Sequence, residues 1–441
     1  MTNSLNSSTS MTTPDNLLDW LALLETRHSK EIDMGLDRVA AVKERLDIRY
    51  ECPVVVVGGT NGKGSTCAML ESILLQAGYR VGLYSKPHFL DFNERARIHG
   101  ESVKDQVFVD VFAEVEVARL MEPAISLTYF EFTTLAICKL LADAKLDAVI
   151  LEVGLGGRLD AVNVIDADVS IVTSVDIDHV DYLGDTREKI GFEKAGIFRT
   201  GRTAICGDPV PPQSLIEHAT KIGADLWLFG RDFNYSGDKQ QWNFGGRVQR
   251  RNSLGYPSLR GANQLLNAAA VLAALEALRN RLPVGAQEVR NGLVMVDLPG
   301  RFQVMPGRPV VVLDVAHNPH AAATLSQNFD NMGFHAYTYA VFGSMLDKDI
   351  DGVIAQIKGK IDHWCVTDLP LPRAASADHL KERLLAAGAL QDAEHSVQTF
   401  TSPEDAYAFA LGKAGENDRI AVFGSFLTVA GVMKARKQNN H

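Results

Sequence analysis

The sequence is poor in cysteine and contains no long apolar run. Its five cysteines are scattered and form no C-x-x-C pair, so we expect reduced thiols, a cytoplasmic protein and no disulfide framework. No stretch approaches the ~18 apolar residues needed to cross a membrane, and no membrane association is expected. The first residues, MTNSLNSSTSMTT, lack the apolar core of a signal peptide, and they predict a disordered tail over residues 1–13.

An excess of positive charge is also missing. The formal net charge is −10, which disfavours a general nucleic-acid binder and leaves an anionic ligand only where there is a local positive site. Hydrophobic residues make up 46% and charged residues 22% of the chain, as in globular proteins. A length of 441 residues is too great for one ordinary core, so two domains are expected.

Short apolar runs alternate with helical patterns in the first two thirds of the chain. This alternation predicts an α/β domain, a mostly parallel sheet wound with helices. A first helix is expected over residues 15–27, with Asp15 as its N-cap. The expected strands lie at residues 53–57, 81–84, 147–154, 168–175 and 203–206, and the clearest helix at 129–144.

The pattern changes after residue 230, where a polar, Gly-containing stretch predicts short antiparallel strands followed by helices at 264–280 and 285–295. The break Leu298-Pro299-Gly300 predicts the domain boundary. We therefore expect a larger first domain over residues 14–298 and a smaller Rossmann-like α/β domain over 299–441. The strands expected in this second domain lie at 309–315, 336–342, 361–367 and 418–424, and the helices at 320–332, 376–387, 402–414 and 425–437.

The stretch VVVVGGTNGKGST, residues 54–66, predicts a phosphate-binding loop. A buried strand leads into glycines that let backbone N–H groups approach an anion at a helix N-terminus. The spelling departs from the common G-x-x-x-x-G-K-[ST] loop, because Gly64 separates Lys63 from the hydroxyl of Ser65.

Two further strands end in acidic or metal-binding side chains. Glu152 closes an apolar run and is followed by GLGGRLDAVN, while Asp176, Asp178 and His179 follow the next run. Open α/β sheets bind ligands at these carboxyl ends, and carboxylates there are suited to Mg²⁺. A solvated acid and a structural histidine are the alternative interpretations.

Three other segments are less specific. Lys194, in EKAGIF, alone suggests a solvated surface lysine. Arg301, at the domain junction, fits a phosphate contact or an interdomain ion pair. Asp314 lies at the end of an expected strand in LDVAHNP, which also contains His317.

Together these segments resemble one family of ligases. The chain resembles the folylpolyglutamate synthases, and within them the bacterial bifunctional dihydrofolate synthase/folylpolyglutamate synthases, which belong to the ATP-dependent Mur-type ligases. The resemblance runs from about Leu17 to Lys434. It rests on GTNGKGS, EVGLGGRLDAVN, DHVDYLG, EKAGIF and ETRHSKEIDMGLDRV, and the family's own phosphate loop has the glycine between lysine and hydroxyl.

The resemblance implies ATP, two Mg²⁺ ions and a carbamylated Lys194 that supports the second ion. It implies amide formation: a substrate carboxylate takes the γ-phosphate, and the amine of L-glutamate then displaces phosphate from the acyl phosphate. Lys63, Lys194 and His317 are the expected catalytic residues. The implied ATP-binding residues are Thr60, Asn61, Gly62, Lys63, Gly64, Ser65, Asn267, Arg301 and Asp314, and the implied metal ligands are Ser65, Glu152, His179 and Lys194.

The implied substrates are dihydropteroate, reduced folates and L-glutamate, handled by a monomer. His317 and Ser425 are expected to position the glutamate. The residues implied for substrate binding are Arg27, His28, Ser29, Thr128, Tyr129, Phe130, Glu131, Arg158, Leu159, Asp160 and Ser425.

One position departs from the family. The residue before Pro87 is Lys86, where the family usually has a serine that helps to bind Mg²⁺. An ammonium cannot ligate a cation, so we expect water in that place and Lys86 turned toward an anion, either Glu152 or a phosphate. The alternatives are that Ser85, one residue earlier, supplies the hydroxyl, or that Lys86 points to solvent.

Three other functions remain open. The first is a monofunctional folylpolyglutamate synthase. The second is a Mur ligase acting on a UDP-sugar. Such an enzyme is expected to carry a separate domain before the phosphate loop, whereas only about forty residues lie between the predicted tail and the stretch that begins at residue 54. The third is a P-loop ATPase or kinase, which the register of Gly64 disfavours. A non-catalytic folate-binding protein would not need Lys63, Glu152, His179 and Lys194 together.

Overall fold

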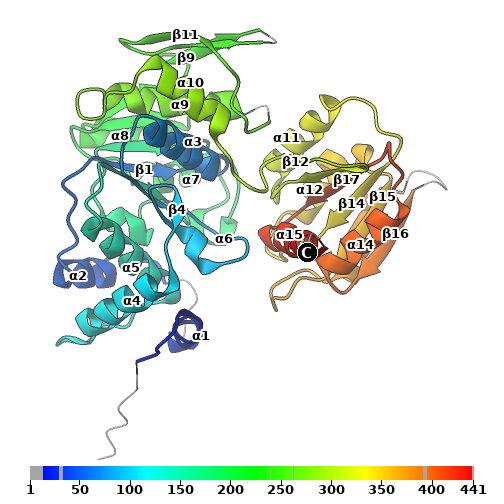
Figure 1. Ribbon diagram of the computed structural model, residues 1–441, viewed down its shortest axis with the longest axis horizontal. Coiled ribbons are helices and arrows are strands. Elements are labelled where there is room, and N and C mark those ends of the chain that lie inside the picture. The colour runs from blue at the N-terminus through cyan, green and yellow to red at the C-terminus, as the bar shows by residue number, and fades with distance from the viewer. Residues whose placement is uncertain (1–12, 29–32, 239, 262, 391–394, 440–441) are drawn as a thin grey trace, which may run out of the picture.

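The computed structural model describes residues 13–28, 33–238, 240–261, 263–390 and 395–439. Ser29 and all but the last residue of the predicted 1–13 tail lie outside these ranges. The chain folds into two α/β bodies, which appear blue to green and yellow to red in Figure 1. No helix among the described residues is long and apolar enough to cross a membrane.

The first body is built on an eight-stranded sheet, and six of its strands, all except β3 and β4, run parallel to one another. β3 and β4 pair antiparallel at one edge. Strand β1 lies between β5 and β6, so the segments that follow these three strands meet at one edge. In order across the sheet the strands are β4 (Glu101–Ser102), β3 (Ala96–Ile98), β2 (Val81–Tyr84), β5 (Ala148–Glu152), β1 (Val54–Gly58), β6 (Val169–Val172), β7 (Thr203–Cys206) and β8 (Asp225–Leu228).

Helices cover both faces of this sheet, and a separate core lies on each face. Because both faces are packed, β1, β2, β5 and β6 are buried at every position. The first face carries α1 (Leu17–Arg27), α2 (Asp37–Arg45), α4 (Asp105–Leu120), α5 (Tyr129–Asp143), α7 (Arg187–Ala195) and α8 (Gln213–Ile222), and the second carries α3 (Lys63–Gln76), α9 (Gln264–Ala277) and α10 (Ala286–Met295).

A small antiparallel sheet extends the second face, as the change of pattern after residue 230 predicts. Trp242 and Phe244 pack from it into the core shared with α3 and α9. Its strands are β9 (Asn234–Gly237), β10 (Trp242–Gly245) and β11 (Arg250–Leu254). The remaining short elements of this body are α6 (Val180–Leu183), η1 (Phe92–Arg95) and η2 (Ala161–Val164).

The second body is a six-stranded sheet, parallel except for its edge strand β12. In order the strands are β12 (Gln303–Met305), β13 (Val310–Leu313), β17 (Arg419–Phe423), β14 (Thr338–Phe342), β15 (His363–Thr367) and β16 (Ser396–Phe400). One face packs α11 (Pro319–Asp330), α12 (Ile350–Ile357) and α13 (Ala377–Ala386), the other packs α14 (Pro403–Lys413) and α15 (Phe426–Asn439), and η3 spans Lys358–Lys360.

The expected fold class is confirmed, with local corrections. Asn16, not Asp15, caps the first helix, because its side chain accepts the backbone N–H of Asp19. The patterns did not predict β12, β16 or α12. The boundary at residues 298/299 stays a proposal, consistent with the change of sheet between β8 and β12.

Candidate active site

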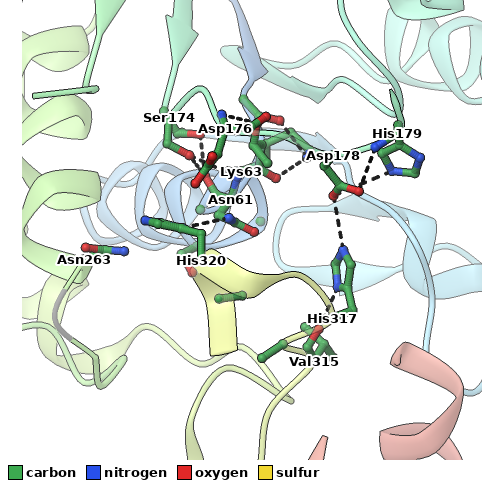
Figure 2. Close-up of a pocket in the computed structure, with 18 of the residues that line it drawn as sticks. Asn61, Lys63, Ser174, Asp176, Asp178, His179, Asn263, Val315, His317 and His320 are labelled. Carbon is green, nitrogen blue, oxygen red and sulfur yellow. Dashed lines mark hydrogen bonds and ion pairs between the residues drawn. The ribbon is translucent and has the colours of Figure 1, made fainter. Parts of the chain in front are cut away.

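A cavity of about 950 Å³ lies where the carboxyl ends of the two sheets face each other. From the first body it is lined by the segments after β1, β5 and β6, and from the second by those after β13, β14 and β17. Figure 2 shows side chains from the segments after β1, β6 and β13. The predicted residues that line it are Thr60, Asn61, Gly62, Lys63, Gly64, Ser65, Glu152, His179, Lys194, Asn267, Arg301, Asp314, His317 and Ser425.

The phosphate loop is fixed by hydrogen bonds to the segment after β6. The N–H of Thr60 donates to Ser174 O at 2.8 Å, the N–H of Asn61 donates to Ser174 Oγ at 3.1 Å, and Thr173 Oγ1 donates to Asn61 O at 2.6 Å. These bonds hold the loop open at the N-terminus of α3, where backbone N–H groups favour an anion.

Two glycines of the loop are required by close packing. Gly59 and Gly62 have φ values of 142° and 87°, which only glycine adopts easily. A Cβ on Gly59 would lie 1.9 Å from Thr173 Oγ1, and one on Gly62 would lie 2.5 Å from Asn267 Oδ1. Asn267, on α9, therefore touches the loop that the sequence assigned to phosphate.

Lys63 is the first residue of α3, and its ammonium turns back to the loop. Lys63 Nζ donates to Gly59 O at 3.0 Å and to Thr60 O at 3.2 Å. Burial lowers its pKa, while the Glu152 carboxylate opposes the shift. These two bonds are to neutral carbonyls, so a phosphate would be a stronger partner for the same ammonium.

Gln264, which the sequence analysis did not include, connects Ser65 to Asn267, the residue predicted to bind ATP. Gln264 Nε2 donates to Ser65 Oγ at 3.3 Å, and Asn267 Nδ2 donates to Gln264 Oε1 at 3.1 Å. Gln264 begins α9 and lies three residues before Asn267, so the helical spacing alone could have suggested it.

Glu152 and Lys194 are buried beside the loop, with exposed fractions of 2% and 4%. Burial raises the pKa of Glu152, although the Lys63 ammonium lowers it in part. Burial, with repulsion from Lys63, lowers the pKa of Lys194 to about 7. Lys194 is thus not the solvated surface lysine of the alternative interpretation; it is a buried amine that loses its proton near neutral pH.

Arg301 reaches the phosphate loop from the second body. A Cβ on Gly64 would lie 3.7 Å from Arg301 Nη2 and 3.9 Å from Glu152 Oε1. The Arg301 guanidinium also lies 5.1 Å from the ring centroid of Phe426. The predicted arginine and the predicted carboxylate therefore meet on the same side of the loop.

Asp314 directly follows β13 and is half-buried near Arg301. Its carboxylate accepts the N–H groups of Phe302 at 2.9 Å and Ala316 at 2.8 Å. Burial raises its pKa to about 6, against the opposing effect of Arg301.

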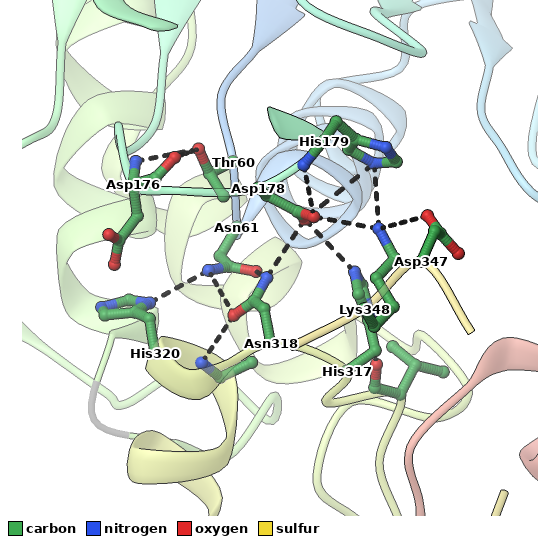
Figure 3. A network of polar contacts seen from close by, with 12 residues as sticks. Thr60, Asn61, Asp176, Asp178, His179, His317, Asn318, His320, Asp347 and Lys348 are labelled. Atoms are coloured by element: carbon green, nitrogen blue, oxygen red, sulfur yellow. Dashed lines mark hydrogen bonds and ion pairs between the residues drawn. The ribbon is translucent and has the colours of Figure 1, made fainter. Parts of the chain in front are cut away.

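Asp178 links the two bodies (Figure 3). It accepts Lys348 Nζ at 2.9 Å and Asn318 Nδ2 at 3.3 Å, and His317 Nε2 lies 3.6 Å away. Burial would raise its pKa, but His317, His179 and Lys348 outweigh that effect and lower it. The sequence analysis missed Lys348, although it follows β14 in MLDKD at the ligand edge of a sheet.

His179 occupies a strained position on the same link. It has φ 52° and ψ 47°, and its Nε2 lies 3.4 Å from Lys348 Nζ. Burial lowers its pKa to about 4, which the Asp178 carboxylate opposes. A neutral imidazole is the form that binds metal ions. A second cross-body contact joins Asn61 Nδ2 to His320 Nδ1 at 3.0 Å.

The expected substrate residues, Ser425 apart, do not line this cavity, and several have structural partners. Thr128 and Glu131 form a capping box at the start of α5. The Asp160 carboxylate accepts the N–H groups of Gly154 and Leu155, both at 2.9 Å. The residues outside the lining are Arg27, His28, Thr128, Tyr129, Phe130, Glu131, Arg158, Leu159 and Asp160.

Two of the expected substrate cations are paired within the protein. Arg27 Nη1 lies 2.5 Å from Glu116 Oε2, and Arg158 Nη2 lies 2.8 Å from Glu193 Oε1. Their assignment to substrate binding stays a prediction, and any such role would have to share these carboxylates.

Lys86 lines the cavity without facing Glu152 through its ammonium. Its Nζ lies 4.0 Å from the ring centroid of Tyr84 and 4.4 Å from that of Phe130. Among the described residues it has no hydrogen-bond partner although it is buried. Only its backbone N–H donates to Glu152 Oε2, at 3.0 Å. The ammonium thus does not pair with Glu152, while the alternative that it turns to a phosphate stays a prediction.

The donor set fits a nucleotide-associated divalent cation better than a protein-only metal cage. Within the described ranges, no three His, Cys, Asp or Glu side chains gather around one point. Mg²⁺ is usually held by one or two carboxylates plus phosphates and water, and the buried Glu152 beside the loop that carries Ser65 meets that need.

Comparison with known proteins agrees with this architecture. Residues 57–275 match the Mur ligase middle domain, and residues 300–426 match the Mur ligase glutamate ligase domain. The chain is thus an ATP-dependent ligase of the Mur type.

Its relatives define the family more narrowly. The chain is 44% identical to the dihydrofolate synthase/folylpolyglutamate synthase of Escherichia coli strain K12 over 95% of both chains. It matches the structure of E. coli FolC in complex with DHPP and ADP with a TM-score of 0.90 and 43% identity, over 97% of this chain and 99% of that one. A bifunctional folylpolyglutamate synthase/dihydrofolate synthase with Mn, AMPPNP and L-glutamate bound matches with a TM-score of 0.88 and 42% identity, over 97% and 100%. The chain belongs to the dihydrofolate synthase/folylpolyglutamate synthase family.

Proposed function

We propose that the chain adds L-glutamate to dihydropteroate, forming dihydrofolate, and to reduced folates, forming folylpolyglutamates, with ATP as the energy source. The observation that carries this proposal is the meeting of Lys63, Glu152 and Arg301 at one cavity between two ligase domains. The relatives crystallised with DHPP and ADP, and with AMPPNP and L-glutamate, support the same substrates.

Activation of the carboxylate comes first. The γ-phosphate of ATP lies on the loop from Thr60 to Ser65, and Lys63 exchanges its two carbonyl partners for phosphate oxygens. A carboxylate oxygen of the substrate attacks the γ-phosphorus, and the bond from that phosphorus to the β-phosphate oxygen breaks. ADP departs, and the substrate carboxylate has become an acyl phosphate. Lys63 and Arg301 offset the negative charge that accumulates during this transfer.

Divalent metal supplies further charge compensation at the phosphates when it is bound. Ser65 and Glu152 would hold the first Mg²⁺, with His179 serving a second. We propose that Lys194 takes up carbon dioxide and becomes a carbamate ligand for that second ion. Its pKa of about 7 supports this, because only the unprotonated amine reacts.

Amide formation follows in the second half of the cavity. The glutamate amine attacks the acyl carbon, and inorganic phosphate leaves with the bonding electron pair. His317 and Ser425 line the cavity from the second body and are proposed to position the glutamate. Contact between the bodies excludes water, which would otherwise hydrolyse the acyl phosphate.

Release of ADP from ATP, dihydropteroate and L-glutamate tests the proposal. We expect release that requires both other substrates, and a second activity with tetrahydrofolate in place of dihydropteroate. Activity with tetrahydrofolate alone would leave a monofunctional folylpolyglutamate synthase. Activity with a UDP-sugar peptide, or ADP release without glutamate, would contradict the proposal.

We also propose a monomer that acts in the cytoplasm. All five cysteines are free, and four of them are buried, which supports a reducing compartment. Equilibrium sedimentation that gave twice the 48.1 kDa chain mass would contradict the monomer.

A further inference from the structure

Lys86 is a buried cation to which the described part of the protein offers no acceptor. Its Nζ lies against the faces of Tyr84 and Phe130, at 4.0 and 4.4 Å from the ring centroids, and no hydrogen bond satisfies it. Ring faces attract an ammonium, but they do not replace the hydrogen bonds that its three donors made to water. Within the described ranges, the Lys86 ammonium therefore lacks an acceptor, and an anion bound beside Nζ would supply one.

The position of this ammonium is fixed by its neighbours. Tyr84 is fully buried, and its hydroxyl is hydrogen-bonded to Thr134 Oγ1 at 2.9 Å. Phe130 packs against Gly154, where a Cβ would lie 2.9 Å from Phe130 Cζ. The backbone N–H of Lys86 is held by Glu152. These contacts fix the buried ammonium of a residue that lines the cavity.

The location indicates which anion it binds. Nucleotide phosphates already have Lys63, Arg301 and the N-terminus of α3 around the loop. Lys86 instead lines the cavity next to Glu152, to which its backbone N–H is bonded. Its ammonium contacts the half-buried ring of Phe130 and the fully buried ring of Tyr84, neither of which lines the cavity. An anion that is itself attached to a flat aromatic group can bring its charge to Nζ and place that group against the partly exposed ring of Phe130.

We propose that Lys86 binds the carboxylate of the aromatic acceptor substrate, the group that ATP activates. This inference rests on the proposed function for the identity of the substrate. Lys86 then contributes in two ways: it pairs with a carboxylate that must lose its water before it attacks a phosphate, and it selects acceptors that carry that carboxylate.

Binding measurements isolate this role from catalysis. Dissociation constants are measured calorimetrically, in buffer with ADP and no divalent metal, for dihydropteroate and for its analogue with hydrogen in place of the carboxylate. For the wild type we expect dihydropteroate to bind about 10- to 100-fold more tightly than the analogue, the range of a charge-assisted hydrogen bond. Lys86→Met should abolish this preference without weakening the binding of the analogue, and Lys86→Arg should keep most of the preference.

Two controls protect the result. Lys221→Met removes an exposed lysine from α8 and should leave both constants unchanged. Lys86→Gln is a second neutral variant, used if thermal melting shows that Lys86→Met does not fold, and it should lose the preference as well.

Equal preference in the wild type and the neutral variants would overturn the inference. Weaker ADP binding with an unchanged preference would also overturn it, because the ammonium would then serve phosphate. The ADP-release assay on the wild type separates the two proposals: turnover with an unchanged preference in the variants leaves the function standing and removes only the role of Lys86. Absence of both binding and turnover in the wild type would remove both.

Discussion

The two sheets present the same kind of edge to one cavity, but they hold their functional groups differently. In the first body, the phosphate loop is bonded to the segment after β6 of its own sheet. In the second body, Lys348 and His317 meet their carboxylate, Asp178, only across the boundary (Figure 3). The phosphate loop is therefore fixed mainly by its own domain, with Asn61 also in contact with His320, whereas Lys348 and His317 meet Asp178 only when the two domains are together.

Removing the phosphate-side charge should have the largest effect. Lys63→Ala should lower kcat at least about 100-fold, because a charge aimed at the transferring phosphate is lost while no core side chain changes. Steady-state ADP release measures the loss, and circular dichroism checks the fold. A folded variant with near-normal kcat would contradict the assignment.

Lys194→Ala should also inactivate the enzyme, by about 100-fold, if a carbamate supports metal. Acetate or propionate should restore part of the activity, since a free carboxylate can occupy the space of the lost one. Mass spectrometry of the intact native protein in bicarbonate tests the modification directly. Full activity of the unrescued variant, or an unmodified lysine in bicarbonate, would argue against it.

Removing the contact between Lys348 and Asp178 should affect the use of glutamate more than the binding of ADP. Lys348→Met leaves Asp178 with a weaker set of partners in a buried place, so we expect kcat/KM for glutamate to fall about tenfold or more. ADP affinity should change less than about twofold, since the loop is held within its own domain. Lys360→Met, which removes a surface pair with Asp330, is the matched control. A large loss of ADP affinity in Lys348→Met would contradict the claim that the phosphate loop is fixed mainly by its own domain.

A smaller effect concerns pH and stability. Asp314 has a folded-state pKa of about 6 against the ordinary aspartate pKa of 3.8, so the folded chain binds more protons between these values. Stability should therefore fall as the pH rises from about 4 to about 6 and then level off, with a cost of about 3 kcal/mol for this group. Asp314→Asn should lack that decline in chemical denaturation from pH 4 to 7.5. Parallel curves for the two proteins would contradict the buried-acid account.

Sequence patterns predicted what a single segment can encode. The run before Gly58 and the loop after it predict a buried strand and a phosphate site, and both lie at the cavity. The spacing of Thr128 and Glu131 is that of a capping box, so the structural role of this pair could also be predicted from the sequence. The family resemblance instead assigned both residues to substrate binding.

Contacts between segments that are distant in the sequence could not be predicted from it. Lys348 and Asp178 are 170 residues apart, and nothing in either segment identifies the other. The ring contacts of Lys86 likewise depend on how β2 and α5 pack, which no local periodicity encodes. The residues at the cavity were therefore predictable where they follow a strand, and their partners across the boundary were not.

Isotope transfer tests the central claim most directly, because it follows the oxygen that the proposed chemistry moves. Dihydropteroate labelled with heavy oxygen in both carboxylate oxygens is converted with ATP and L-glutamate, and the released phosphate is analysed by mass spectrometry. The account predicts that one labelled oxygen appears in phosphate and the other stays in the new amide. Unlabelled phosphate alongside amide product would show that ATP does not phosphorylate the carboxylate, and would contradict the account.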